Sequence, residues 1–184
     1  MELVDEAGRE RVHRIIYDEL CLGEIRASSR AEYLAIIEGL AAAGVHVDVF
    51  SDIAPDPDYA MVEAGIERLR TSGAQAVLAV GGGSPLDCAK VLNLSHANGC
   101  HPSKLTGLWL FALPRKRGLP FYAVPTTAGS GSEVTMAAVV SDHAAQSKRT
   151  IVDPKTLPDM VALDPSFTVG LRPSITAPTA LRRI

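Results

Sequence analysis

Residues 76–87 read AVLAVGGGSPLD, an apolar run that passes directly into three glycines. A continuous apolar run of this length is typical of a central parallel strand that is buried on both faces. After the glycines we predict a helix from Pro85 to about Ala97, which Asn98 and Gly99 end. A buried strand, a glycine turn and a helix in this order indicate an α/β fold.

The glycine turn, residues 81–83, also predicts a binding site. Glycine tolerates positive φ and lets the backbone approach a bulky anion closely. We expect Ser84 to cap the helix, Pro85 to take its first position and Asp87 to reach back in a capping box. The free amides and positive dipole of this helix end suit a pyrophosphate. The alternative is a capped turn that binds no ligand, because the segment is neither the GxGxxG fingerprint nor a P-loop.

The part of the chain before this segment predicts further strands and helices. Residues 12–17 are short and rich in β-branched side chains, which predicts a first strand. A helix is expected over residues 28–43, and the alternating VHVDVF of residues 45–50 predicts a second strand. Asp58 is placed to cap another helix, which Gly73 ends.

The part of the chain after this segment predicts a long loop and three short strands. Residues 101–119 contain two prolines and a basic run, which indicates a surface loop. Strands are predicted at residues 121–124, 136–140 and 160–163. Strands that alternate with helices imply right-handed crossovers and a Rossmann-like, doubly wound, mostly parallel sheet. Ligands of such sheets bind beyond the carboxyl ends of the strands.

A second polar segment follows the predicted strand at residues 121–124. Residues 125–135 read PTTAGSGSEVT. Within it, the hydroxyl loop of residues 126–130 places small donors and acceptors beside glycine, which suits contact with phosphate, ribose or amide groups. Taken alone, the pattern also fits a polar loop without a ligand.

Together the two segments resemble the iron-containing alcohol dehydrogenase family. The segments that carry the resemblance occur in family order and at family-like spacing: GGGSPLDCAK at residues 81–90, PTTAGSGSEVT at 125–135, Asp142, Lys148 and LDP at 163–165. The resemblance covers residues 12–179 and implies a Rossmann-like domain that binds a nicotinamide cofactor, followed by an all-helical metal domain. We therefore expect an NAD(P)-binding α/β domain at residues 1–179 and a divergent tail at residues 180–184.

The resemblance also implies which residues bind the cofactor. These are Asp18, Gly82, Gly83, Ser84, Asp87, Thr126, Thr127, Ser130 and Lys148. The two glycines and Ser84 would meet the pyrophosphate, and the three hydroxyl residues after them would contact the phosphates or the nicotinamide side. Lys148 would contact a ribose, and Asp87 would lie near the nicotinamide. Asp18 would accept hydrogen bonds from the adenosine ribose and repel a 2′-phosphate, which favours NAD over NADP.

The sequence departs from the family pattern in two places. Asp56 stands where the family commonly has asparagine, in the middle of a Pro-x-Pro turn. After Thr179 the family continues with a Gly-Met-Asp-Ala-Leu-x-His type segment that begins the metal site, whereas this chain reads ALRRI to Ile184. We therefore expect the all-helical metal domain and the ligands of the implied Fe²⁺ ion to be absent. None of the five histidines pairs with an acid at helical spacing, so no metal site is predicted.

The activity that the resemblance implies is reversible hydride transfer between an alcohol and its aldehyde or ketone. This chain would supply the cofactor-binding half, and its catalytic residues are unknown. The alternative is a truncated, catalytically inactive nucleotide-binding module. A weaker alternative is the related dehydroquinate synthase and glycerol dehydrogenase branch, which uses zinc, but PTTAGSGSE favours the iron branch. The expected partner is a small-molecule alcohol or carbonyl substrate, and the sequence leaves a homo-oligomer open.

Composition and charge exclude several other classes of protein. A net charge of −3 over 184 residues offers no basic face for nucleic acid. The acidic N-terminus excludes a secretory signal, and no apolar stretch approaches the ~20 residues that span a bilayer. Cys21, Cys88 and Cys100 lack CxxC spacing, which argues against disulfides and a thiolate metal cluster. We therefore expect a cytoplasmic protein with neither a nucleic-acid nor a membrane partner.

Overall fold

The computed structural model describes residues 44–51, 53–106 and 115–163. The chain divides into two compact units, residues 50–163 and a unit made of residues 1–49 and 164–184. Several sequence predictions lie outside the described residues: the strand at residues 12–17, the helix at 28–43, Asp18, and the domain boundary at residue 179.

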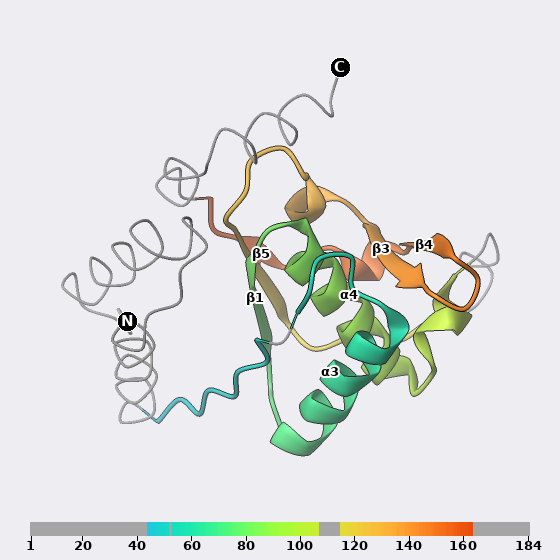
Figure 1. Ribbon diagram of the computed structural model, residues 1–184. Helices are drawn as coiled ribbons and strands as arrows, with labels where there is room; N and C mark the ends of the chain where they lie inside the picture. The colour runs from blue at the N-terminus through green and yellow to red at the C-terminus, as the bar shows by residue number, and fades with distance from the viewer. Residues whose placement is uncertain (1–43, 52, 107–114, 164–184) are drawn as a thin grey trace, which may run out of the picture. The chain divides into compact units, whose positions relative to one another are not determined.

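A parallel three-stranded sheet, in the order β1-β2-β5, forms the frame of residues 50–163 (Figure 1). β1 (Val77–Gly81) pairs with β2 (Phe121–Pro125) in a register that ends with Gly81 opposite Pro125. β5 (Met160–Val161) pairs with β2 and is shorter than the strand predicted at residues 160–163. The parallel pairing confirms the predicted α/β class with a Rossmann-like parallel sheet.

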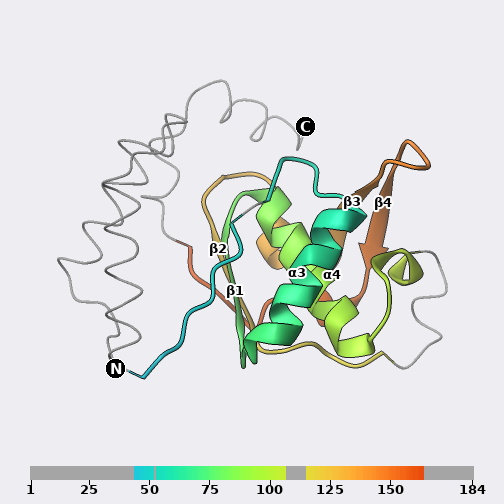
Figure 2. The same ribbon diagram turned by 60° about the horizontal axis from the view of Figure 1, so that its bottom comes forward.

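Two helices pack side by side in this unit (Figure 2). α3 (Tyr59–Ser72) begins where the Oδ1 atom of Asp58 accepts a 2.8 Å hydrogen bond from the amide of Met61, and it ends at Gly73 with φ 66°. α4 (Gly83–Asn98) ends at Gly99 with φ 58°. Asp58 and both terminal glycines therefore have the capping roles that the sequence predicts.

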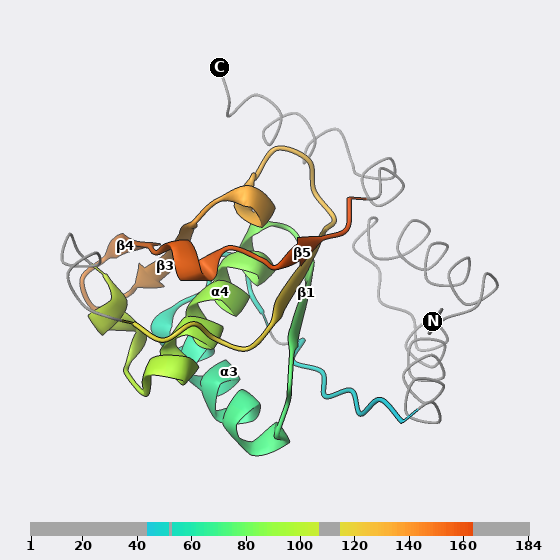
Figure 3. The same cartoon turned by 180° about the vertical axis from the view of Figure 1, so that it is seen from behind.

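α4 lies between the parallel sheet and an antiparallel hairpin (Figures 1 and 3). The hairpin joins β3 (Ala137–Asp142) to β4 (Ser147–Val152). β3 extends the strand predicted at residues 136–140, whereas β4 was not predicted, because its exposed SKRT segment lacks an apolar alternation. Three short 3₁₀ helices connect the larger elements: η2 (Pro102–Leu105), η4 (Ser132–Val134) and η5 (Pro154–Thr156).

The core follows from the central place of α4, which is buried along most of its length. One cluster joins the helix to the sheet through Leu86, Ala89, Ala79, Phe121 and Ala123. The other joins it to α3 and the hairpin through Val62, Val91, Leu94, Val140 and Ile151. Packing on both sides holds α4 firmly, so the position of its N-terminal end is set relative to the strands.

Two strand predictions are wrong in detail. Residues 45–50 form no strand, because the alternation of VHVDVF specifies two faces but not a neighbouring strand to pair with. Within residues 50–163, β1 is buried on one face only, since Leu78 and Val80 are 63% and 50% exposed. α4 covers the other face of the strand, where Ala79 is buried.

In the described part of the chain, no helix has the length and hydropathy needed to cross a membrane.

Candidate functional site

The glycine turn and the hydroxyl loop meet at the carboxyl ends of β1 and β2. Gly81 and Pro125 are register partners, and the amide of Thr126 donates a 2.9 Å hydrogen bond to the carbonyl of Gly81. A Cβ atom at Gly82 would lie 3.2 Å from the side chain of Thr127, and one at Gly83 would lie 3.3 Å from that of Ser130. The two loops are thus packed closely enough that any side chain on these glycines would displace the hydroxyl loop.

The N-terminus of α4 is not capped by a side chain. The N-cap residue is Gly82 rather than the predicted Ser84, and the helix begins one residue before Ser84. The Ser84 hydroxyl instead accepts a 3.4 Å hydrogen bond from the amide of Asp56, outside the helix. An N-terminus without a side-chain acceptor keeps its amide donors and positive dipole available for an anion.

Asp87 also differs from the prediction, because it does not form a capping box. Its carboxylate accepts hydrogen bonds from the Ser132 hydroxyl and, at 2.9 Å, from the amide of Val139. Burial raises the pKa of this carboxyl, while the two hydrogen bonds and Lys90 act in the opposite direction. With α4 beginning at Gly83, Asp87 lies beyond the first helical turn, and its side chain is turned toward the segment after the hydroxyl loop.

Lys148 lies on β4 and forms a 2.6 Å ion pair with the carboxylate of Asp56. Asp56 has φ 56°, a left-handed conformation that aspartate and asparagine tolerate better than most residues. Because the amide of Asp56 also donates to Ser84, this turn links Lys148 to the N-terminus of α4. Both groups of the ion pair are largely exposed, so the contact contributes orientation rather than much stability.

The structure therefore brings together most of the residues that the sequence singles out. Gly82 lies against Thr127, Gly83 lies against Ser130, and Ser84 and Lys148 are connected through Asp56. Asp18 lies outside the described residues.

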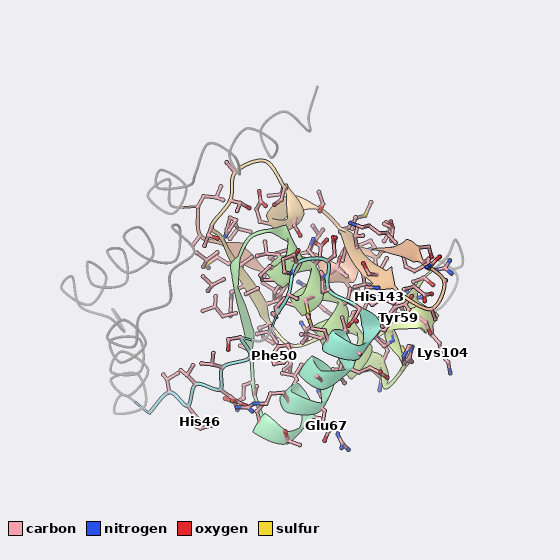
Figure 4. The ribbon with its side chains drawn as sticks, viewed as in Figure 1. His46, Phe50, Tyr59, Glu67, Lys104 and His143 are labelled. Atoms are coloured by element: carbon pink, nitrogen blue, oxygen red, sulfur yellow. The ribbon has the colours of Figure 1, made fainter. Side chains whose placement is uncertain are left out.

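A shallow hollow on the hairpin is lined by Ser141, Asp142, His143, Gln146, Ser147 and Lys148. His143, in the turn of this hairpin, lies 3.3 Å from the carboxylate of Asp58, which precedes Tyr59 at the start of α3 (Figure 4).

Sequence reasoning gave no role to two buried polar residues of α4, Lys90 and Asn93. Lys90 donates to backbone carbonyls of the segment that leads into β3, and Asn93 exchanges two hydrogen bonds with the backbone of Leu119. A lysine three residues after an aspartate on an otherwise apolar helix was the available signal, since such residues share one helical face.

Cys88 provides a test of how tightly α4 is packed. Its thiol is fully buried, and burial, together with the charges of Asp87 and Asp58, raises its pKa to about 12. At pH 8 the thiolate fraction should then be about 10⁻⁴, too small for rapid alkylation. In a Cys21→Ser background we expect a chromogenic disulfide reagent to modify Cys100 quickly and Cys88 only after denaturation. Two fast equivalents in the native protein would contradict this packing.

Comparison with known proteins finds a matching protein family and several curated relatives of this chain. The model of the family described as iron-containing alcohol dehydrogenase matches residues 20–165. Alcohol dehydrogenase 4 of Saccharomyces cerevisiae (strain YJM789) is 34% identical over 138 residues, which are 75% of this chain and 35% of that protein. Lactaldehyde reductase of Escherichia coli (strain K12) is 30% identical over 146 residues, which are 79% of this chain and 38% of that protein.

Solved structures show the same relationship. A crystal structure of 1,3-propanediol oxidoreductase superimposes with a TM-score of 0.71 and 29% identity, covering 80% of this chain and 38% of that one. Sulfoacetaldehyde reductase from Bifidobacterium kashiwanohense, solved in complex with NAD⁺, also gives 0.71 and 29%, covering 92% and 46%. The chain thus spans about a third of the length of the curated relatives described above.

Proposed function

The chain belongs to the iron-containing alcohol dehydrogenase family, and from this premise we propose that residues 76–148 contain its binding site for a nicotinamide dinucleotide. The observation that carries the proposal is the contact between the glycine turn and the hydroxyl loop beside an uncapped helix N-terminus. Backbone amides and a helix dipole bind a pyrophosphate without a cationic side chain. The carboxyl ends of parallel strands are also where such folds bind nucleotides.

Each group of residues in this site is proposed to contact a different part of the cofactor. Gly82, Gly83 and Ser84 meet the pyrophosphate, because they form the N-cap and the first two positions of α4. Thr126, Thr127 and Ser130 offer hydroxyl and amide groups to the phosphates or the nicotinamide side. Lys148, oriented by Asp56, contacts a ribose. Asp18 is proposed to favour NAD over NADP by repelling a 2′-phosphate.

The reaction proposed for the enzyme to which this domain belongs is the interconversion of a small alcohol and its aldehyde or ketone. Relatives of this chain are named alcohol dehydrogenases and lactaldehyde reductase, which supports this class of substrate. The bound nicotinamide would accept or donate the hydride. The part played by the residues described here is to bind the dinucleotide and to orient it.

The family name also implies iron, but the described residues do not fit an iron ion. Within residues 44–51, 53–106 and 115–163, no group of three histidine, cysteine, aspartate or glutamate side chains converges as a metal site would require. A second candidate is a nucleotide-binding module without catalysis of its own.

Titration of the 184-residue chain with NADH tests the proposed function. We expect weak binding, with a dissociation constant of about 0.1–1 mM, equivalent to about 4–5.5 kcal/mol. ADP-ribose should compete with NADH, whereas adenosine, which lacks the pyrophosphate, should not. Fluorescence of NADH and calorimetry both report the binding.

The same titration separates the candidates. Absence of heat and of a thermal shift with millimolar NADH would count against the site. Formation of NADH from short alcohols and diols would identify an enzyme, and binding without turnover would identify the nucleotide-binding module.

A further inference from the structure

Lys90 is a buried cation that the proposed cofactor contacts leave without a role. It lies on α4 with 1% of its surface exposed. Its ammonium nitrogen donates hydrogen bonds to the carbonyl oxygens of Thr135 at 2.7 Å and Ala137 at 2.8 Å, and lies 3.4 Å from the hydroxyl of Thr135. All three contacts go to residues 135–137, where the chain after η4 enters β3, 45 or 47 residues further along the chain.

Asp87 lies about one helical turn before Lys90 and binds the residues on either side of the same segment. Its carboxylate accepts hydrogen bonds from the hydroxyl of Ser132 and from the backbone amide of Val139. Residues three apart on a helix share a face, so the carboxylate and the ammonium group act on a single strip of backbone. Together they attach residues 132, 135, 137 and 139 to α4.

The hydroxyl loop is therefore held at both ends. At its start, the amide of Thr126 is bonded to the carbonyl of Gly81 at the end of β1. After its end, Ser132 is bonded to Asp87. Between these two points Thr127 and Ser130 lie against the glycine turn.

Burying charged side chains is not an efficient way to stabilise a protein. Removing an ammonium group from water costs free energy that good hydrogen bonds only partly return, and apolar residues of similar size often stabilise a protein equally well. Lys90 and Asp87 direct these hydrogen bonds to one segment rather than distributing them through the core. Their contribution is thus to the position of that segment.

We propose that Lys90 and Asp87 are a pair of positioning residues that hold the hydroxyl loop against the glycine turn and so keep the two halves of the binding site together. The identity of the ligand rests on the proposed function, but the attachment of the loop does not. The pair acts on the ligand through Thr127 and Ser130.

The test compares Lys90→Met and Asp87→Asn with the matched control Lys104→Met. Methionine keeps the stem of the lysine and removes its donors, and asparagine keeps the shape of the aspartate. Lys104 is exposed on η2 and its side chain extends away from the described unit (Figure 4). Amide hydrogen exchange is measured by residue segment, well below the melting temperature, and NADH affinity is measured in parallel.

We expect amide exchange over residues 126–139 to become at least tenfold faster in both variants, while exchange in β1 and in α4 stays near the unmodified rate. NADH affinity should fall at least fivefold, and Lys104→Met should change neither quantity. If Lys90→Met does not fold, Asp87→Asn carries the test.

A uniform rise in exchange over residues 50–163, or no rise at residues 126–139, would overturn the proposal. If the unmodified chain fails to bind NADH, the proposed function fails, but the local exchange still decides whether the pair positions the loop.

Discussion

Replacing Asn93 by alanine is expected to lower the free energy of unfolding by about 2–6 kcal/mol, because it leaves two backbone groups without a hydrogen-bond partner, at about 1–3 kcal/mol each. Asn93 is 5% exposed on α4. Its side-chain amide donates to the carbonyl of Leu119 and its carbonyl oxygen accepts from the amide of Leu119, both at 3.0 Å. These bonds anchor the chain just before β2. Urea unfolding, followed by circular dichroism, measures the loss.

Asn98 provides a matched control on the same helix. It exchanges the same two kinds of hydrogen bond with the backbone of Lys116, at 2.8 Å and 3.0 Å, but in an exposed setting. Water can replace the lost partners there, so Asn98→Ala should cost only about 0.5–1 kcal/mol. Equal losses in the two variants would show that burial of the Asn93 contacts is not what makes them important.

Gly81→Ala is the second substitution with a large expected effect, a loss of roughly 2–5 kcal/mol from backbone strain and steric overlap together. Gly81 has φ 147°, which side chains rarely permit. A Cβ atom there would lie 2.7 Å from the Cγ atom of Pro85, in a ring that cannot rotate away. Relief of this overlap would shift the start of α4 and the bond from Thr126 to Gly81. NADH binding should therefore fall together with the melting temperature.

Gly99→Ala is a control that separates the effect of backbone strain from the effect of steric overlap. Gly99 also has positive φ, at 58°, but no atom lies within 4 Å of a Cβ built there. Its expected cost is about 1–2 kcal/mol, the conformational penalty alone. NADH affinity should stay unchanged, because Gly99 is at the opposite end of α4 from the glycine turn. A Gly81→Ala variant as stable as Gly99→Ala would contradict the steric overlap expected with Pro85.

Local patterns predicted the elements whose signals lie within a few residues. Asp58 and Gly73 delimit α3 as expected, and α4 ends within one residue of its predicted end. Capping depends on neighbouring backbone groups, so the sequence contains both partners of each interaction. The placement of the glycine turn and the hydroxyl loop at adjacent strand ends was predictable for the same reason, once the strands were taken as parallel.

Predictions that required a distant partner were less complete. Residues 45–50 alternate correctly but form no strand, and β4 forms although its sequence has no clear alternation. Ser84 has the residue type of an N-cap, yet its hydroxyl is bonded to Asp56, 28 residues away. Asn93 bonds the backbone of a loop that the sequence indicated only as irregular. In each case tertiary contacts overrode the local preference.

The separation in sequence of the contacts that join the two loops has a consequence for the order of folding. The hydrogen bonds of Asp87 and Lys90 join residues that are 45 to 52 positions apart in the sequence. β1 and β2 pair across a similar sequence separation. Such non-local pairings form slowly and late, because the entropy of closing the chain is lost before any contact compensates it. The proposed dinucleotide site is therefore expected to be absent from early folding species. A bound cofactor would act on the completed structure, prolonging its lifetime against unfolding rather than accelerating its formation.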